Sequence, residues 1–315
     1  MGSVDQIQTE VHRLMELGVA DKTHATYETG WVRFSEFCGE HGFSVVLPVP
    51  VDTICAFIAY LSLNKFAHAT MATYLAGIGF QHKVHGFENP GNCFIVGLML
   101  KGVRRDRGAS QDLRLPITLH HLSKILEVLP KICSSQFEAI LFKAVFTCMF
   151  WGFLRIGEVA ASSKHNIQNS VLQRSDVVCQ EKYGINVLII SFRVSKNNQF
   201  GDQQVIEIKS QHNLAFCPVF ALSNYLAQAS ASSVLFSHFD SSPLTKYQLN
   251  HVLRKAVDFC DFPHRQLFQS HSFRIGAATT AKQMGMSDEE IQSMGRWESG
   301  AFRRYIRLPV FSDDA

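Results

Sequence analysis

The stretch FEAILFKAVFTCMFWGFL, residues 137–154, restricts the fold more than any other part of the chain. Its length and its almost continuous apolar character predict a helix with no solvent-facing side. Such a helix must be buried among other elements. Hydrophobic residues make up 46% of the 315 residues, which is enough to build a core around it. We therefore expect a domain with this helix at its centre.

The segment between about residue 165 and residue 210 has a different pattern. Strands are predicted for three β-branched runs, VLQRSDVVC, INVLIISFRVS and QQVIEIKS. The last two are joined by KNNQFGD, whose Asn, Gly and Asp tolerate turn conformations. Helical patterns return from Cys217 to the end. The predicted fold class is therefore mainly α with a small antiparallel β-sheet.

Residues 1 to about 105 have helical spacing throughout. Four helices are predicted: one carries Trp31 and Phe34 and ends near Gly42, a second is capped by Asp52 or Thr53, and the others cover TMATYLAGIGFQHKVHG and CFIVGLMLKGVRR. Together they make a compact helical bundle. The polar stretch RRDRGASQDLRLP then indicates an interdomain linker. The predicted domains are residues 1–108, a helical bundle, and 109–315, an α+β domain.

The charge and the cysteines exclude only a few kinds of protein. The formal net charge of +3 permits nucleic-acid binding, and seven Lys and Arg stand against four Asp and Glu between Arg265 and Arg307. The eight Cys are scattered with no CxxC pair, which argues against zinc or disulfides and favours reduced thiols in an intracellular protein. No run of about 18 apolar residues occurs, so no membrane partner is expected.

Four short motifs in the second domain carry residues suited to chemistry. They are FLRIGEVAAS with Arg155 and Glu158, VSKNNQFGDQQ with Lys196, HSFRIGAATTAKQMG with His271 and Arg274, and MGRWESGAFRRYIRLP with Trp297 and Tyr305. Each motif alone is weak, because a lone Tyr is more often a core or surface residue than a nucleophile. Their common order along the chain is much harder to obtain by chance.

This arrangement resembles the tyrosine recombinase (phage integrase) family. The stretch from Gly295 to Arg307 is similar to the GRW-x-S-x-x-F-x-x-Y-I-R pattern of the eukaryotic DIRS, Ngaro and Crypton transposons. The resemblance implies that residues 1–108 form a helical, SAM-like core-binding domain for DNA and that 109–315 form the catalytic domain. It also implies site-specific DNA cleavage and rejoining through a 3′-phosphotyrosine, for recombination or integration of a mobile element. Neither metal, ATP nor another cofactor is expected to take part.

The chemistry of phosphodiester cleavage explains the two arginines. The transition state carries extra negative charge on the phosphate oxygens, which many nucleases neutralise with metal ions. The sequence has no obvious carboxylate cluster to hold metals. Arg155 and Arg274 can serve instead, because a guanidinium offers a planar, permanently charged fork to two oxygens.

The resemblance assigns the remaining roles. Tyr305 is the nucleophile, and His271 aids the phosphate or removes the phenol proton, which has a pKa of about 10 in a free tyrosine. Lys196 protonates the leaving 5′-oxygen, Trp297 donates its indole N–H to the phosphate, and Glu158 positions Arg155.

The local sequence around the nucleophile predicts how it is held. Ser287 and Glu290 form a capping box for a short helix, and Ser299 can cap the next one, which carries Phe302 and Tyr305 one turn apart. Gly276 and the two alanines after it let the helix of Arg274 pack tightly.

Contacts to double-stranded DNA are expected from both the bundle and the linker. The candidates on the third helix are Thr70, Thr73, Tyr74, Gln81, His82 and Lys83, and those in the linker are Arg104, Arg105 and Arg107. A solvated helix face and a solvated linker explain the same residues equally well.

Two other readings of the sequence remain open. The chain could be a catalytically silent, transposon-derived DNA-binding protein, although such a module has no reason to keep the whole catalytic set. It could also be a type IB topoisomerase, but the separate bundle and the transposon-like ending favour a recombinase. A recombinase implies a homo-oligomer, a tetramer when two duplexes are joined, and a nuclear location in a eukaryote. Only ten residues follow Tyr305, so we expect either that assembly uses another surface or that the chain is a trimmed copy.

Overall fold

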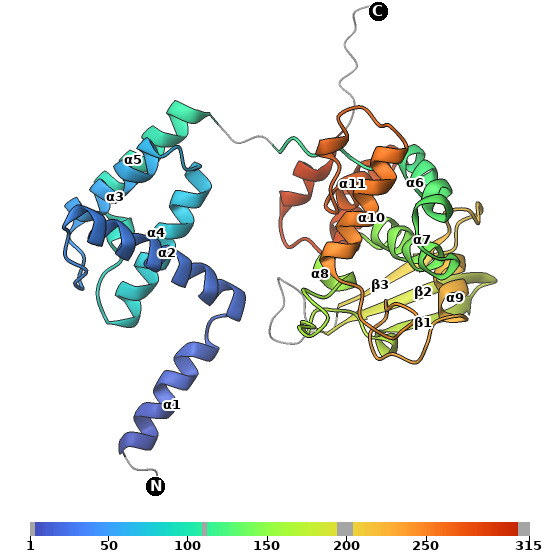
Figure 1. Ribbon diagram of the computed structural model, residues 1–315, viewed down its shortest axis with the longest axis horizontal. Helices are drawn as coiled ribbons and strands as arrows, with labels where there is room; N and C mark the ends of the chain where they lie inside the picture. The colour runs from blue at the N-terminus through green and yellow to red at the C-terminus, as the bar shows by residue number, and fades with distance from the viewer. Residues whose placement is uncertain (1–3, 109–111, 194–203, 308–315) are drawn as a thin grey trace, which may run out of the picture. The chain divides into compact units, whose positions relative to one another are not determined.

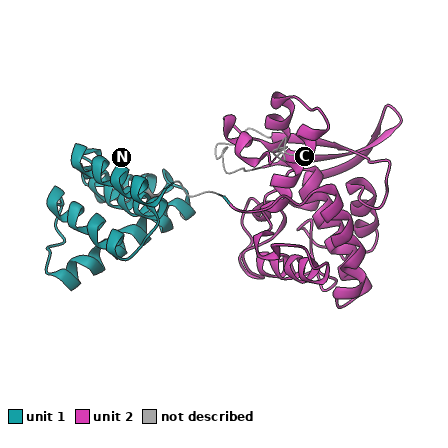
Figure 2. Ribbon diagram, turned by 90° about the horizontal axis from the view of Figure 1, so that it is seen from above, with its two compact units in different colours: residues 1–112 teal, residues 113–315 magenta. Residues whose placement is uncertain are grey.

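The computed structural model describes residues 4–108, 112–193 and 204–307. The chain forms two compact units, residues 1–112 and 113–315 (Figures 1 and 2). The division predicted after residue 108 lies close to this boundary. Each unit has its own hydrophobic core, and the fold class expected from the sequence is confirmed: helices predominate, and the described residues contain one small antiparallel sheet.

Unit 1 is built from helices. They are α1 (Val4–Leu17), α2 (Asp21–His41), α3 (Val51–Leu63), α4 (His68–Val84), the 3-10 turn η1 (Pro90–Asn92) and α5 (Phe94–Arg107). The four predicted helices correspond to α2–α5. Helix α2 ends at Gly42, whose φ of 72° lets its N–H return to Cys38 O. The predicted cap of α3 is wrong, because the helix follows Pro50 and contains both Asp52 and Thr53.

Two glycines allow α2 and α4 to approach each other closely. A Cβ atom on Gly77 of α4 would lie 2.3 Å from Tyr27 O, and one on Gly30 of α2 would lie 2.8 Å from Tyr74 O. Backbone oxygens in packed helices cannot move aside as a flexible side chain can. The bundle therefore depends on the absence of side chains at this crossing.

We expect Gly77→Ala to destabilise unit 1 by about 1–3 kcal/mol, the usual cost of an overpacked core. Gly97→Ala in α5 is the matched control, because its Cβ would meet nothing within 4 Å. That change should stabilise the helix by about 0.5–1 kcal/mol, since alanine is the better helix former. Urea denaturation of the full chain, followed by circular dichroism, measures both. Equal shifts in the two variants would contradict the proposed packing.

Unit 2 surrounds the central apolar helix predicted from the sequence. Its elements are α6 (Leu119–Ile132), α7 (Gln136–Trp151), α8 (Ile156–Val159), η2 (Arg174–Asp176), β1 (Val177–Lys182), β2 (Ile185–Phe192), β3 (Gln204–Lys209), α9 (Pro218–Leu226), α10 (Lys246–Phe259), η3 (Arg265–Leu267), α11 (Ser272–Gln283), α12 (Asp288–Gly295) and η4 (Gly300–Tyr305). Helix α7 packs against α6, α9 and α11, and almost all of its side chains from Ala139 to Phe150 are buried. The expectation of a buried central helix is confirmed.

The sheet has the strand order β1-β2-β3 with antiparallel neighbours (Figure 1). Val177 pairs with Ile190, and Val187 pairs with Lys209. The first predicted strand begins too early. Leu172 is instead buried with its N–H bonded to Glu158 O, and residues 174–176 form a 3-10 turn.

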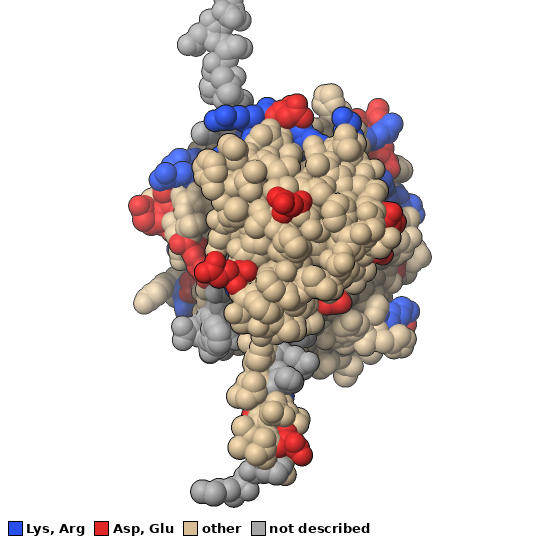
Figure 3. Space-filling model, turned by 90° about the vertical axis from the view of Figure 1, so that its left-hand side faces the viewer, with Lys and Arg blue, Asp and Glu red and all other residues tan. Residues whose placement is uncertain are grey.

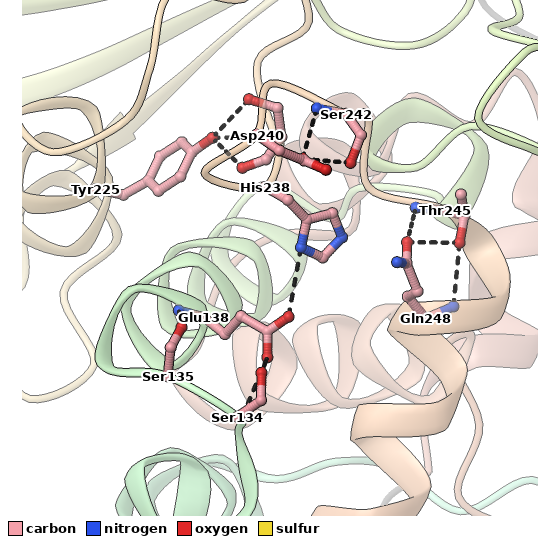
Figure 4. Close-up of polar contacts among 10 residues, drawn as sticks. Ser134, Ser135, Glu138, Tyr225, His238, Asp240, Ser242, Thr245 and Gln248 are labelled. Carbon is pink, nitrogen blue, oxygen red and sulfur yellow. Dashed lines mark hydrogen bonds and ion pairs between the residues drawn. The ribbon is translucent and has the colours of Figure 1, made fainter.

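Polar contacts fix the start of α7 and the loop beside it (Figure 4). Ser135 accepts from Glu138 N, and a Glu138 carboxylate oxygen lies 3.5 Å from His238 Nδ1. The hydroxyl of Tyr225 donates to Ser237 O at 3.0 Å and accepts from Ser237 N at 2.9 Å. A helix of sixteen residues is about 24 Å long. This polar cluster therefore lies far from Arg155, which follows the other end of α7.

Candidate active site

The site is assembled from three segments of unit 2: the α7–α8 turn, the start of α11, and the chain from α12 into η4. Phe153 in the turn has a φ of 50°, an unfavourable left-handed conformation for a bulky residue. That conformation presents the Phe153 carbonyl to two arginines, Arg274 and Arg296, whose Nη atoms donate to it.

Arg274 is buried in the first turn of α11, with 1% of its surface exposed. Besides the bond to Phe153 O, its Nη2 donates to Gly295 O at 2.8 Å, while Nε has no partner among the described residues. Burial, followed by the charges of Arg155 and Arg296, lowers the pKa of Arg274. Among the described residues, only backbone carbonyls accept hydrogen bonds from its guanidinium. An anion placed there would therefore gain a strong electrostatic interaction.

Arg155 stands before α8 and is held by Glu158. The Arg155 backbone N–H donates to one Glu158 carboxylate oxygen at 2.8 Å, and its Nη1 donates to the other at 3.1 Å. The Glu158 side chain is 4% exposed, and that of Arg155 is 23% exposed. The carboxylate thus fixes the guanidinium while leaving part of it open.

The ring of Tyr305 lies between two aromatic neighbours. Its centroid is 5.0 Å from that of His271 and 4.9 Å from that of Trp297, and the Arg274 guanidinium carbon is 5.8 Å from it. Trp297 is almost fully buried, and its Nε1 has no hydrogen-bond partner in the part of the chain that the structure describes. This indole N–H is an unused hydrogen-bond donor, and its donation to a phosphate oxygen stays a prediction.

Tyr305 is the last residue of η4, whose start is capped as the sequence predicts. Ser299 accepts from Ala301 N, and Ser287 and Glu290 form the expected capping box of α12. Thr279 of α11 holds the backbone at the end of η4: it donates to Tyr305 O at 3.3 Å and accepts from Arg307 N at 3.0 Å. No sequence pattern indicated this role of Thr279, because a buried Thr in a helix is commonplace.

A cavity of about 490 Å³ opens beside these residues, lined in part by Gln292, Arg296 and Trp297. Among residues 4–108, 112–193 and 204–307, no group of three or more His, Cys, Asp or Glu could hold a metal ion. The eight cysteines are free thiols. No helix in the described ranges is long and apolar enough to cross a membrane.

Comparison with known proteins identifies the fold. No protein-family model matches the chain. It is 25% identical to the integrase/recombinase xerD homolog of Selenomonas ruminantium over 99% of this chain and 89% of that protein. The XerH site-specific recombinase bound to palindromic difH superposes with a TM-score of 0.61 at 17% identity, covering 90% of this chain and 76% of that one.

Two other solved structures are similar over nearly the whole chain. The Tn1549 transposon integrase in complex with circular intermediate DNA gives a TM-score of 0.61 at 14% identity, covering 96% of this chain and 95% of that one. A lambda integrase dimer bound to a COC′ core site gives 0.58 at 14% identity, covering 98% of each.

The chain therefore has the fold of these site-specific recombinases and integrases, and its sequence is similar to that of a recombinase. This fold brings five predicted catalytic residues into one site. They are Arg155, His271, Arg274, Trp297 and Tyr305. The sixth, Lys196, lies outside the described residues.

Helix α4 carries the bundle's candidate DNA contacts. Thr70 and Thr73 lie one turn apart and are partly exposed, while Lys83 in the last turn is exposed. His82 is the exception, because its side chain is buried. Its Nε2 accepts from Val49 N at 2.9 Å and its Nδ1 lies 2.8 Å from Ile78 O. The prediction that His82 contacts DNA is wrong: the imidazole ties α4 to the segment before α3.

The basic residues assigned to the linker belong to the last turns of α5. Arg104 and Arg105 are exposed there and stay candidates for phosphate contacts. Arg107 instead donates to Ser62 O at 2.6 Å and to Phe66 O, so its guanidinium ties α5 to the end of α3. Placing these residues in a linker was wrong. The face turned to the reader in Figure 3 is mostly neither basic nor acidic, with a few Asp and Glu side chains on it, so it offers little attraction to phosphate.

Arg296 is the site residue that sequence reasoning missed. It ends α12 with a φ of 54°, and its Nη2 forms an ion pair with Glu158 at 2.9 Å inside the protein. Its guanidinium carbon also lies 3.7 Å from the Phe192 ring centroid. The sequence does show an arginine between Gly295 and Trp297, but the family motif includes it as one letter of a fixed stretch, so its own role is not indicated.

Proposed function

We propose that this protein is an active site-specific DNA strand transferase, with Tyr305 as the covalent nucleophile. The observation that carries the proposal is the position of the Tyr305 ring, beside His271 and Trp297 and close to the buried charge of Arg274. A surface or core tyrosine has no need of a buried arginine and an unpartnered indole N–H beside it.

The proposed step exchanges one phosphate ester for another. Tyr305 Oη attacks the phosphorus as His271 assists removal of its proton, and the bond to the DNA 5′-oxygen breaks. Lys196 supplies the proton that the leaving oxygen needs. Arg155 and Arg274 stabilise the charge that develops on the non-bridging oxygens. Because the phosphotyrosine ester keeps the bond energy, a DNA 5′-hydroxyl can reverse the reaction.

The finer assignments rest on the motif around the nucleophile. The stretch from Gly295 to Arg307 supports an origin in a eukaryotic mobile element of the DIRS, Ngaro or Crypton type, and with it a nuclear location. Two of the solved relatives, XerH and the Tn1549 integrase, are DNA-bound, and the lambda integrase is a DNA-bound dimer. A tetramer that joins two duplexes is the assembly that recombination requires.

A suicide substrate tests the proposal without knowledge of the target sequence. The substrate is a library of duplexes of randomised sequence. Each duplex contains a labelled candidate for the scissile phosphodiester and a nick a short distance to its 3′ side. Cleavage then releases a short 5′-hydroxyl fragment that diffuses away, so rejoining fails and the covalent complex accumulates. We expect adducts that resist SDS and are enriched in one sequence. A silent DNA-binding protein would instead enrich a bound sequence and give no adduct.

We expect adduct formation to be unchanged in EDTA and without ATP. Arginine charges take the place of metal ions, and the phosphotyrosine ester conserves the bond energy. Rates on the selected duplex, measured with EDTA and then with added Mg²⁺, check this. A tenfold or greater loss in EDTA would show that a divalent ion takes part in the chemistry.

A further inference from the structure

Arg296 carries a buried charge in an unfavourable setting. Its side chain is 3% exposed, its Nε and Nη1 have no partner among the described residues, and burial lowers its pKa. Its neighbourhood contains Phe153, Phe192 and Trp297, which an apolar side chain would suit better. Replacing a buried ion pair by apolar groups is often neutral or stabilising. The stability of the fold therefore does not explain an arginine here.

The backbone around Arg296 is also shaped to admit it. A Cβ on Gly295 would lie 1.7 Å from the Trp297 ring, so glycine is needed at that position for the indole to pack. The left-handed residue that ends a helix is usually glycine, but here it is Arg296. This conformation turns its side chain inward.

Two partners of the Arg296 guanidinium, Glu158 and the Phe153 carbonyl, also hold the catalytic arginines. Glu158 receives one Arg296 Nη2 bond at 2.9 Å and also binds Arg155 through both of its oxygens. The Phe153 carbonyl accepts from Arg296 at 3.4 Å and also from Arg274. Phe192, under the guanidinium, is the last residue of β2. Arg296 therefore contacts an immediate partner of each catalytic arginine.

We infer that Arg296 is a positioning residue for strand cleavage: through Glu158 and the Phe153 carbonyl it sets the places of Arg155 and Arg274 around the scissile phosphate. The inference rests on the proposed function. The unpartnered donors and the strained backbone are tolerated because they fix two guanidinium groups at once. Misplacement of catalytic groups by about 1 Å can lower a rate about 100-fold.

The test compares two substrates that differ in the charge of the scissile phosphate. One is the selected nicked duplex, and the other carries a methylphosphonate, in which a methyl group replaces one non-bridging oxygen. Because this linkage is neutral, the rate of its cleavage depends less on correctly placed arginine charges. We expect Arg296→Met to slow adduct formation about 100-fold on the phosphate and less than about 10-fold on the methylphosphonate, each relative to wild type. Its melting temperature should equal or exceed that of wild type.

Controls separate positioning from folding. Arg254→Met removes an exposed arginine from α10 and should change neither rate nor stability. If Arg296→Met does not fold, Arg296→Lys replaces it, since lysine keeps the charge but lacks the planar fork. An equal defect on both substrates, or wild-type rates in the variant, overturns the inference alone. A wild type that forms no adduct on any duplex overturns the proposed function together with it.

Discussion

Tyr305→Phe is expected to abolish the covalent adduct while leaving DNA binding within about threefold of wild type. The phenylalanine ring can keep the contacts with His271 and Trp297, because those contacts involve the ring and not the hydroxyl. What is lost is the oxygen that attacks phosphorus. The assay is SDS-resistant adduct formation on the selected nicked duplex, with binding followed separately by fluorescence anisotropy.

Tyr247→Phe provides the matched control for this result. Tyr247 is 76% exposed on α10 and stacks on His251, and it is not among the residues of the candidate active site. The same loss of a hydroxyl there should leave adduct formation unchanged. An adduct that persists in Tyr305→Phe would assign the covalent link to another residue and remove the basis of the proposed mechanism.

The order of catalytic residues could be predicted from the sequence, as could the fold that carries them. The helix of residues 137–154 had to be buried because it lacks a polar side, and α7 is central. The capping boxes follow from local chemistry, since Ser287 and Glu290 need only be three residues apart. Both kinds of signal depend only on residues that are close together in the sequence. They can therefore be recognised without knowledge of tertiary contacts.

The predictions that were wrong concern residues whose tertiary contacts override the local sequence pattern. Val171 and Leu172 have strand-like composition, but burial beside α8 takes them out of the sheet. Arg107 belongs to a polar run, yet its guanidinium bonds backbone carbonyls at the end of α3. The role of Arg296 depends on two left-handed residues far apart in the chain, Phe153 and Arg296, and no spacing rule reports such a pair.

Arg274 differs from Arg155 and Arg296 in what holds its charge. Glu158 neutralises Arg155 and Arg296 directly, whereas among the described residues Arg274 donates hydrogen bonds only to backbone carbonyls. Its lowered pKa has the sign expected for a cation that is poorly compensated in the free protein. A phosphate bound beside it would raise that pKa again, so Arg274 is the residue whose charge gains most from substrate.

For this reason Arg274→Ala should have the largest effect of any arginine substitution. We expect adduct formation to fall on the order of a thousandfold or more, which corresponds to about 4 kcal/mol of transition-state stabilisation. Arg274→Lys should recover little, because a compact ammonium lacks the planar fork whose separate nitrogens reach Phe153 O and Gly295 O. Single-turnover rates on the nicked duplex measure both variants.

DNA affinity distinguishes transition-state stabilisation from simple binding. Many phosphates contribute to the affinity of a duplex, so the loss of one charge should weaken binding less than about tenfold. Arg155→Ala should resemble Arg274→Ala in this respect, because Glu158 would keep Arg296 as its partner and remain paired. If cleavage and binding fall by equal factors in both variants, the arginines hold DNA and do not act on the reacting phosphate. A cleavage loss that exceeds the binding loss a hundredfold places their charge on the transition state.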